Sequence, residues 1–427
     1  MSIKTLHVTN AYHAASGGIR TMYHAMLAAA NLERRRMRLV VPSEESRIEE
    51  VGSYGRIYHV EAPRSPLVDS RYRLLLPHTF LRSRGPVRRI VDAERPDLVE
   101  VCDKYSLCYL AGLLRRGWLG ASPRPTLVGL SCERLDDNVA SAIGPAPACR
   151  RFARWYLGRI YTGQFDFHLA NSEYTAQEIS DSMRRKHQRE VHVVPMGVHL
   201  DGLGPHLRSH ALRAEMAHRL GEDAGDDLTW LLYAGRLSPE KNLPLLVEML
   251  TRLEDRPRRW RLLVVGDGPL AGALRADAER RARGRVLMWG HVAERETLAR
   301  LYASCDVFVH PNPREPFGIA PLEAMASEAP LVAPAAGGLR SYANDDNAWL
   351  VEPTGEAFAR AVVGACEPGM LRDGRLARAR ATAAMFDWTR VARMIFGVYD
   401  ALHSRRRRAW DALGPLSVQC PPIRGAR

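Results

Sequence analysis

The sequence predicts an α/β protein with two doubly wound, parallel-sheet domains. Short apolar, β-branched runs recur along the chain and alternate with helix-like stretches. This alternation is typical of parallel sheets that are covered by helices on both faces. The length of 427 residues also exceeds that of one ordinary domain, so we expect two cores of roughly 200 residues each.

The expected strands fall into two sets with a break between them. The first set covers residues 5–10, 37–42, 56–60, 97–102, 126–132, 167–172 and 191–197. The second set covers residues 230–236, 261–268, 286–292, 306–311 and 329–334. Residues 197–210 and 221–227, rich in Gly, Asp and His, show no strand pattern. We therefore place the domains at 1–200 and 201–387, followed by an amphipathic helix and a tail at 388–427.

The net charge and the cysteine spacing of the chain indicate which ligands and partners to expect. The balance of 61 Lys+Arg against 48 Asp+Glu gives a formal charge of +13, which attracts phosphate groups. The basic residues are scattered rather than interleaved with aromatics on one face, so nucleic acid is not an expected partner. The seven cysteines form no CxxC pair, so the sequence predicts neither a disulfide framework nor a zinc site.

No targeting or membrane-spanning segment is expected. The first residues lack an apolar core of signal-peptide length, and no run approaches the ~18 apolar residues of a membrane span. We expect a cytoplasmic protein. Residues 63–90 mix Arg with Leu, Tyr and Phe, which leaves peripheral contact with an anionic membrane open. An ordinary helix with a buried apolar face fits that stretch better.

The segment "EPFGIAPLEAMA" at 315–326 is the most informative. Glu315 lies just past the strand expected at 306–311, and Glu323 lies inside the helix that follows. Carboxylates accept hydrogen bonds from vicinal hydroxyls, and a helix N-terminus binds anions. The segment therefore suits a ligand with a sugar, a phosphate and a ribose. The alternative is a capping charge and a surface residue. The amides expected at the anion site belong to Phe317, Gly318 and Ile319.

Other polar or glycine residues follow neighbouring strands. Arg236 and Lys241, which offer a forked contact and a point charge, suit a diphosphate. Gly266 ends a strand in a tight turn that allows close approach of the backbone. Gly290 and Val292 end another strand, and their backbone groups are candidates for contact with a base.

Gly17 and Gly18 follow the first strand of the chain. Glycines at that position let backbone amides approach a phosphate closely. An ordinary turn explains the pair equally well.

Taken together, these stretches resemble the family four retaining glycosyltransferases of the GT-B superfamily. The resemblance covers most of the chain and is strongest from about 230 to 355. It rests on "GRLSPEKN", "VVGDGP", "WGHV", "EPFGIAPLEAMA", "APAAGGLRSY" and "NAWLVEP". It implies two Rossmann-like domains that face a deep inter-domain cleft, with a final helix around 388–410 that returns to the first domain.

The resemblance also implies roles for individual residues. Glu315 would contact the donor sugar, and Glu323 would contact the ribose. The residues that would bind the diphosphate are Arg236, Lys241, Gly17 and Gly18.

The chain departs from this family after the strand expected at 126–132. Many members have a histidine there, whereas this chain has Ser131, Cys132 and Glu133. Glu133 is our candidate on the acceptor side, with an ion pair to Arg134 or a helix cap as an equal alternative. Lys104 and Cys132 are further acceptor-side candidates.

The resemblance implies retaining, metal-independent transfer of a hexose from a nucleotide diphosphate sugar to a hydroxyl acceptor. No metal or other cofactor is expected, and the acceptor is a glycan, a glycolipid or a small molecule. The alternatives are a sugar-nucleotide epimerase of the same architecture, a glycogen- or starch-type synthase, and a non-catalytic basic binding protein. The sequence does not name the sugar, the base or the acceptor.

Overall fold

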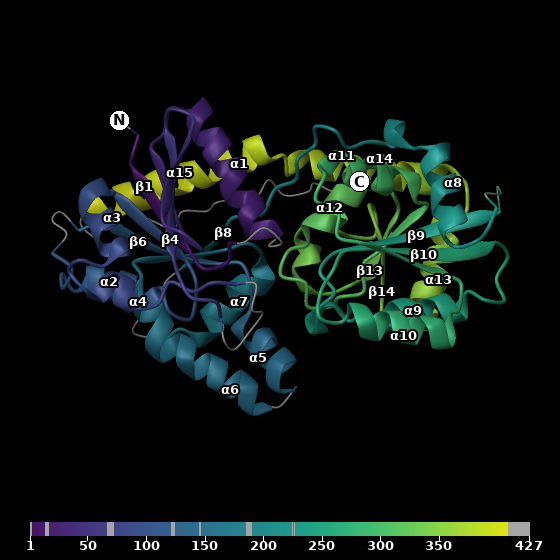
Figure 1. Cartoon of the computed structure of the whole chain (residues 1–427), viewed down its shortest axis with the longest axis horizontal. Helices are drawn as coiled ribbons and strands as arrows, with labels where there is room; N and C mark the ends of the chain where they lie inside the picture. The colour runs from purple at the N-terminus through teal and green to yellow at the C-terminus, as the bar shows by residue number, and fades with distance from the viewer. Residues whose placement is uncertain are drawn as a thin grey trace. The chain divides into compact units, whose positions relative to one another are not determined.

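The chain folds into two α/β units, as Figure 1 shows. The computed structural model describes residues 2–12, 17–65, 72–120, 124–144, 147–184, 190–223, 225 and 227–408. One unit holds the residues up to Met196 and the C-terminal helix from Trp388, and the other holds Gly197–Asp387. Each unit has helices packed on a largely parallel sheet, which confirms the predicted fold class.

The first unit contains an eight-stranded sheet over its described residues, in the order β3-β4-β2-β1-β5-β6-β7-β8. Its strands are β1 (Thr5–Thr9), β2 (Met37–Ser43), β3 (Arg47–Val51), β4 (Gly55–Glu61), β5 (Leu98–Cys102), β6 (Thr126–Ser131), β7 (Phe167–Ala170) and β8 (Val191–Val193). The strand order runs outward in both directions from β1 and β5, so the switch point of the sheet lies between these two strands.

Helices cover this sheet. They are α1 (Gly18–Leu32), α2 (His78–Leu81), α3 (Pro86–Glu94), α4 (Cys108–Arg115), α5 (Leu135–Ile143), α6 (Pro147–Tyr156), α7 (Glu173–Ser182) and α15 (Trp388–Arg407). The central strands β1 and β5 are buried along their whole length, including the polar side chains of His7 and Glu100.

The second unit has a parallel sheet in the order β11-β10-β9-β12-β13-β14. Its strands are β9 (Leu228–Ala234), β10 (Arg259–Val265), β11 (Val286–Gly290), β12 (Val307–Val309), β13 (Leu331–Pro334) and β14 (Trp349–Val351). Its helices are α8 (His210–Arg219), α9 (Pro244–Arg252), α10 (Ala271–Arg281), α11 (Arg295–Ser304), α12 (Ile319–Ala326), α13 (Gly355–Cys366) and α14 (Met370–Met385). Its switch point lies between β9 and β12.

Two strands are absent from the sequence-based prediction. β3 pairs antiparallel with β4 at the edge of the first sheet, and its sequence RIEEV is mostly charged. An exposed edge strand does not need an apolar run, so the pattern that identifies buried strands does not reveal it. β14 has three half-buried residues and pairs with β13.

The last helix, α15, packs on the first unit. Arg35, between α1 and β2, forms an ion pair with Asp400, and Oγ1 of Thr126 in β6 lies 3.0 Å from Nδ1 of His403. Tyr399 donates a hydrogen bond to the fully buried carboxylate of Glu100 in β5. These contacts hold α15 to the core of this unit.

The apolar residues between 63 and 90 lie mainly inside the first unit. Leu75 and Phe80 are fully buried, and Leu81 is exposed. Leu75 precedes α2 and Phe80 lies within it, so part of the apolar content of this stretch packs into the first unit. Residues 66–71 lie outside the described residues. Among the helices that the structure describes, none has the length and apolar content to cross a bilayer.

Three glycines, Gly235, Gly266 and Gly290, lie at the carboxyl ends of β9, β10 and β11. The amide of Gly266 donates to the carbonyl of Gly290 (2.8 Å), and the amide of Gly235 donates to the carbonyl of Val265 (3.0 Å). Gly266 has a φ of 137°, and a Cβ at this position would lie 1.9 Å from the carbonyl oxygen of Gly235. Only glycine fits there, because the two loops are in backbone contact.

Replacing Gly266 with alanine should therefore destabilise the second unit. The disfavoured φ alone costs on the order of 1–3 kcal/mol, and the steric clash adds to that. Gly272 in α10 is the matched control, because a Cβ there meets no atom within 4 Å. Gly272→Ala should leave the free energy of unfolding unchanged or raise it by about 0.5–1 kcal/mol. Urea denaturation measures both, and equal stability of the two variants would contradict this account.

Candidate functional site

The switch point of the second sheet gathers charged side chains around one carboxylate. Glu315 lies in the loop between β12 and α12, and only 8% of it is exposed. Lys241, in the loop after β9, places its Nζ 2.7 Å from Oε2 of Glu315. The two loops are neighbours because β9 and β12 pair in the sheet.

Two further side chains from the β12 loop contact the same oxygen. Asn312 donates from Nδ2 to Oε2 of Glu315 (3.1 Å), and Nε2 of His310 lies 3.2 Å from that oxygen. Burial alone would raise the pKa of Glu315, but Lys241 and His310 more than offset it and hold the pKa well below its ordinary value. The carboxylate is therefore ionised at neutral pH and acts as a hydrogen-bond acceptor.

Backbone contacts hold this arrangement in place. Asn242, in the left-handed conformation at a φ of 53°, donates from Nδ2 to the carbonyl of Pro311 (3.1 Å) and joins the two loops. The amide of Gly338, after β13, donates to the carbonyl of Glu315 (2.7 Å). A Cβ at the neighbouring Gly337 would lie about 3 Å from backbone atoms of Glu315, so the glycine pair permits this close packing.

The start of α12 lies next to Glu315. Gly318 is the N-cap residue, has a φ of 91° and provides no side-chain cap. Its carbonyl accepts a hydrogen bond from the hydroxyl of Tyr342 (2.6 Å), and the buried ring of Phe317 packs against the same tyrosine. Ile319 begins the helix, so the predicted amide segment does lie at a helix N-terminus.

Glu323 lies one turn further along α12. It accepts a hydrogen bond from the hydroxyl of Tyr302 in α11 (2.9 Å), and burial raises the pKa of its carboxyl. The structure thus places Glu315 and Glu323 in different surroundings, one beside a cation and the other beside a phenol.

The other predicted site residues of the second unit also lie near the carboxyl ends of its strands. Arg236 is exposed and forms an ion pair with Glu240 at 2.8 Å. Gly266 contacts the loop of Gly235, and the carbonyl of Gly290 accepts the Gly266 amide. Val292 follows β11 and is half-buried.

In the first unit, Gly17 is the N-cap of α1 and Gly18 is its first residue. The carbonyl of Gly17 accepts from the amide of Thr21, and a Cβ at Gly17 would meet no atom within 4 Å. The glycine pair therefore starts a helix just beyond β1, as an anion-binding role requires.

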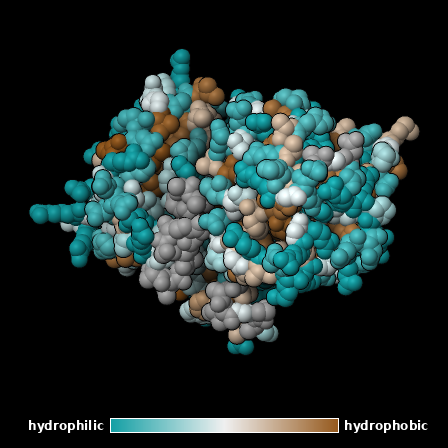
Figure 2. Space-filling view, turned by 45° about the vertical axis from the view of Figure 1, so that its right-hand side comes forward, coloured by the Kyte–Doolittle hydropathy of each residue, from teal (hydrophilic) through white to brown (hydrophobic). Residues whose placement is uncertain are grey.

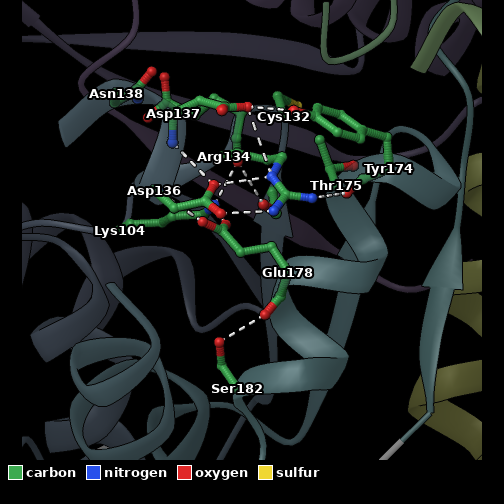
Figure 3. Close-up of polar contacts among 12 residues, drawn as sticks. Lys104, Cys132, Arg134, Asp136, Asp137, Asn138, Tyr174, Thr175, Glu178 and Ser182 are labelled. Carbon is green, nitrogen blue, oxygen red and sulfur yellow. Dashed lines mark hydrogen bonds and ion pairs between the residues drawn. The ribbon is translucent and has the colours of Figure 1, made fainter. Parts of the chain in front are cut away.

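A second polar cluster follows β5 and β6 in the first unit (Figure 3). The buried Lys104 places its Nζ 2.8 Å from Oε2 of Glu178 in α7, and it also donates to the carbonyl of Glu133. Oε1 of Glu178 accepts the amide of Asp136 at the start of α5 (2.8 Å). Lys104 is therefore part of a framework of polar contacts that joins α5, α7 and the loop after β6.

Arg134 lies at the centre of this cluster, as Figure 3 shows. It makes a forked ion pair with Asp136 (2.7 and 2.9 Å), and its guanidinium lies 4.4 Å from the ring centroid of Tyr174. The carboxylate of Glu133 instead accepts a long hydrogen bond from Tyr105 (3.4 Å). The main partner of Arg134 is thus Asp136, which disfavours the alternative of a Glu133–Arg134 pair.

Cys132 is buried, and its Sγ lies 4.0 Å from that of Cys102 at the end of β5. Its carbonyl accepts from Nδ2 of Asn171 (3.2 Å). Ser131 donates to the carbonyl of Glu133 (3.1 Å). The backbone of this segment is firmly held, and Glu133 is its half-buried carboxylate.

Sequence reasoning missed His310 and Asn312. Both lie just past the observed end of β12 at Val309, as Glu315 does, so the rule that ligand-binding side chains follow parallel strands would have found them. Within the described residues, no three His, Cys, Asp or Glu side chains are grouped in a way that could hold a metal ion.

One protein family and several characterised proteins are similar to this chain in sequence. The family described as "Glycosyl transferases group 1" matches residues 229–367. A GDP-mannose-dependent alpha-(1-6)-phosphatidylinositol dimannoside mannosyltransferase of Mycobacterium tuberculosis is 28% identical over 94% of this chain and 97% of its own length. A D-inositol 3-phosphate glycosyltransferase of Jonesia denitrificans is 30% identical over 74% of each chain.

Solved structures share the fold. Anabaena HepE in complex with UDP-glucose matches 93% of this chain and 100% of its own chain, with a TM-score of 0.67 and 18% identity. Sucrose-phosphate synthase from Thermosynechococcus elongatus matches 94% of this chain and 99% of its own, with a TM-score of 0.71 and 17% identity.

The depressed pKa of Glu315 predicts how its contribution to stability depends on pH. In the unfolded chain this carboxyl titrates near its ordinary value of 4.5. Its ionised form is stabilised in the fold, so its contribution is fully present above that value and is lost as the pH falls toward the lower folded pKa. The difference in melting temperature between the wild type and Glu315→Gln should be constant from pH 6 to 8 and shrink below about pH 4.5. A difference that grows on acidification would contradict the pairing.

Proposed function

Because this chain belongs to the group 1 glycosyltransferases and has the GT-B fold, we propose that it is a retaining hexosyltransferase. It would move a hexose from a nucleotide diphosphate sugar to a hydroxyl acceptor without a metal ion. The observation that carries this proposal is the ionised Glu315, held by Lys241 at the switch point of the second sheet.

The donor would lie along this edge of the second sheet. Glu315 accepts hydrogen bonds from hydroxyls of the donor sugar, since it is ionised and has acceptor capacity beyond its present partners. Lys241, which contacts this carboxylate, would also bind the diphosphate and stabilise both negative charges. Arg236 and the amides at the start of α12 add further positive potential. Glu323 would accept from the ribose.

The transfer step would need little covalent help from the protein. The bond between the sugar C1 and the phosphate oxygen breaks, and the acceptor oxygen forms its bond to C1 on the same face. The acceptor proton passes to a phosphate oxygen of the leaving nucleotide. Preorganised positive charge around the diphosphate stabilises the charge that develops there. Gly17 and Gly18 are predicted to add amides to that charge.

The relatives suggest which substrates to test first. The mycobacterial relative is named as dependent on GDP-mannose and as acting on a phosphatidylinositol dimannoside. The Anabaena structure contains UDP-glucose. GDP-mannose and a lipid-linked acceptor are therefore the first candidates here, and UDP-glucose and soluble acceptors follow.

Glu133 is the candidate that we propose for orienting the acceptor. Its backbone is held by Ser131 and Lys104, whereas its side chain has a long hydrogen bond to Tyr105. A half-buried carboxylate on a rigid backbone suits an incoming hydroxyl. Lys104 and Cys132 would then support the position of Glu133 without contacting the acceptor.

The test is release of nucleotide diphosphate from a panel of sugar nucleotides, with and without acceptors, in the presence of EDTA. We expect one donor to be consumed by the wild type. Both Glu315→Gln and Lys241→Met should lower kcat/KM by on the order of a hundredfold, since each removes charge complementarity at the donor. NMR of the product should show the same anomeric configuration as the donor.

The matched control is Glu356→Gln, because Glu356 lies in the first turn of α13 with a half-exposed side chain. It should keep wild-type turnover. Loss of activity in EDTA would contradict metal independence, and inversion at the anomeric carbon would contradict retention. Conversion of a donor to its epimer without nucleotide release would favour the epimerase alternative.

A further inference from the structure

Helix α6 presents two large aromatic side chains to solvent. Phe152 and Trp155 are 51% and 53% exposed, and their ring centroids lie 6.1 Å apart. The exposed arginines of the same helix are Arg150, Arg151 and Arg154. The sequence of α6, PACRRFARWY, contains no acidic residue. We call these five side chains the α6 surface.

The helix is positioned to expose this surface. Cys149 and Ala153, four residues apart, are buried and attach α6 to its unit. Phe152 and Trp155 are three residues apart and share an outward stripe. Tyr156 stacks on Phe152 (6.2 Å) and donates its hydroxyl to the carbonyl of Lys104 (2.7 Å). The aromatic stripe is therefore fixed to the polar cluster that also holds Glu133.

Other exposed apolar side chains do not form such a surface. Within the described part of the first unit, Leu32, Ile48, Leu81 and Trp118 are exposed on separate elements or loops, whereas the exposed Tyr105 and Tyr109 lie beside Tyr156 of α6. On the face that Figure 2 shows, the surface is largely hydrophilic and apolar residues form small areas. Isolated apolar residues are normal on protein surfaces, whereas a paired aromatic stripe beside three arginines indicates a binding function.

We propose that the α6 surface docks the protein on an anionic lipid membrane. Trp and Phe side chains partition into the boundary between headgroups and acyl chains. The three arginines bind lipid phosphates, and a surface without acidic residues favours a negatively charged partner. The proposal names the membrane-contacting element of the proposed glycosyltransferase, so it rests on the proposed function only where a lipid-linked acceptor is concerned.

Vesicle sedimentation with the full chain and no nucleotide sugar tests this proposal. The wild type should sediment with vesicles of phosphatidylglycerol and phosphatidylcholine and not with pure phosphatidylcholine. Arg150→Gln/Arg151→Gln/Arg154→Gln should weaken binding by roughly fivefold per arginine, on the order of a hundredfold in all. Phe152→Ser/Trp155→Ser should lower the bound fraction at least tenfold, a rough figure from the lost apolar contact.

Matched controls separate a local surface from net charge. Trp118→Ser removes an exposed aromatic elsewhere in the first unit. Arg280→Gln/Arg281→Gln/Arg283→Gln removes three charges from a helical region of the second unit, and these arginines have acidic partners. Both controls should bind vesicles like the wild type.

Three results would overturn the proposal. They are no binding by the wild type, equal binding to neutral vesicles, and equal loss of binding in the α6 and control variants. Self-association of the wild type that the α6 variants abolish, without vesicle binding, would assign the surface to a protein interface instead. Nucleotide release measured without vesicles should be unchanged in the α6 variants, so failure of the proposed function would be detected separately.

Discussion

The buried carboxylate of Glu315 is the constraint on which the arrangement of the second unit's sheet edge depends. Removing an isolated carboxylate from water costs several kcal/mol, so its burial requires cationic and hydrogen-bonding partners. Lys241 and Asn312 supply those partners from two different loops. The loops meet because β9 and β12 are adjacent at the switch point, although Lys241 and Glu315 are 74 residues apart. The same geometry leaves an ionised acceptor beside a cation, a combination that suits a sugar linked to a diphosphate.

The first unit uses its charged residues differently. Lys104 and Arg134 pair with Glu178 and Asp136, and these pairs hold the segment after β6 in one conformation. A buried ion pair of this kind fixes the positions of its side chains but adds little to the free energy of folding, because desolvation offsets much of the Coulomb attraction. What the framework positions is Glu133. The hydroxyl of Tyr156 extends the framework to α6.

The fold could be predicted from the sequence to a large extent, because buried parallel strands require apolar runs that are visible without a structure. β9, with the sequence LTWLLYA, is such a strand, whereas the charged edge strand β3 is not. Glu315 and Lys241 were also predictable, since each follows a recognisable strand. The partners of Lys104 were not, because its pairing with Glu178 depends on the three-dimensional meeting of β5 and α7. The same limit applies to α6, since exposure of Phe152 and Trp155 cannot be known from composition.

The most direct test of the central claim is the thermal stabilisation of the protein by nucleoside diphosphates. A ligand that binds only the folded state stabilises it by an amount that grows with the logarithm of the ratio of free ligand concentration to Kd, and so raises the melting temperature. One of GDP, UDP or ADP should raise the melting temperature of the wild type, and Lys241→Met should abolish the rise while Glu356→Gln retains it. An equal rise in Lys241→Met would contradict the claim that the switch point of the second unit binds the diphosphate.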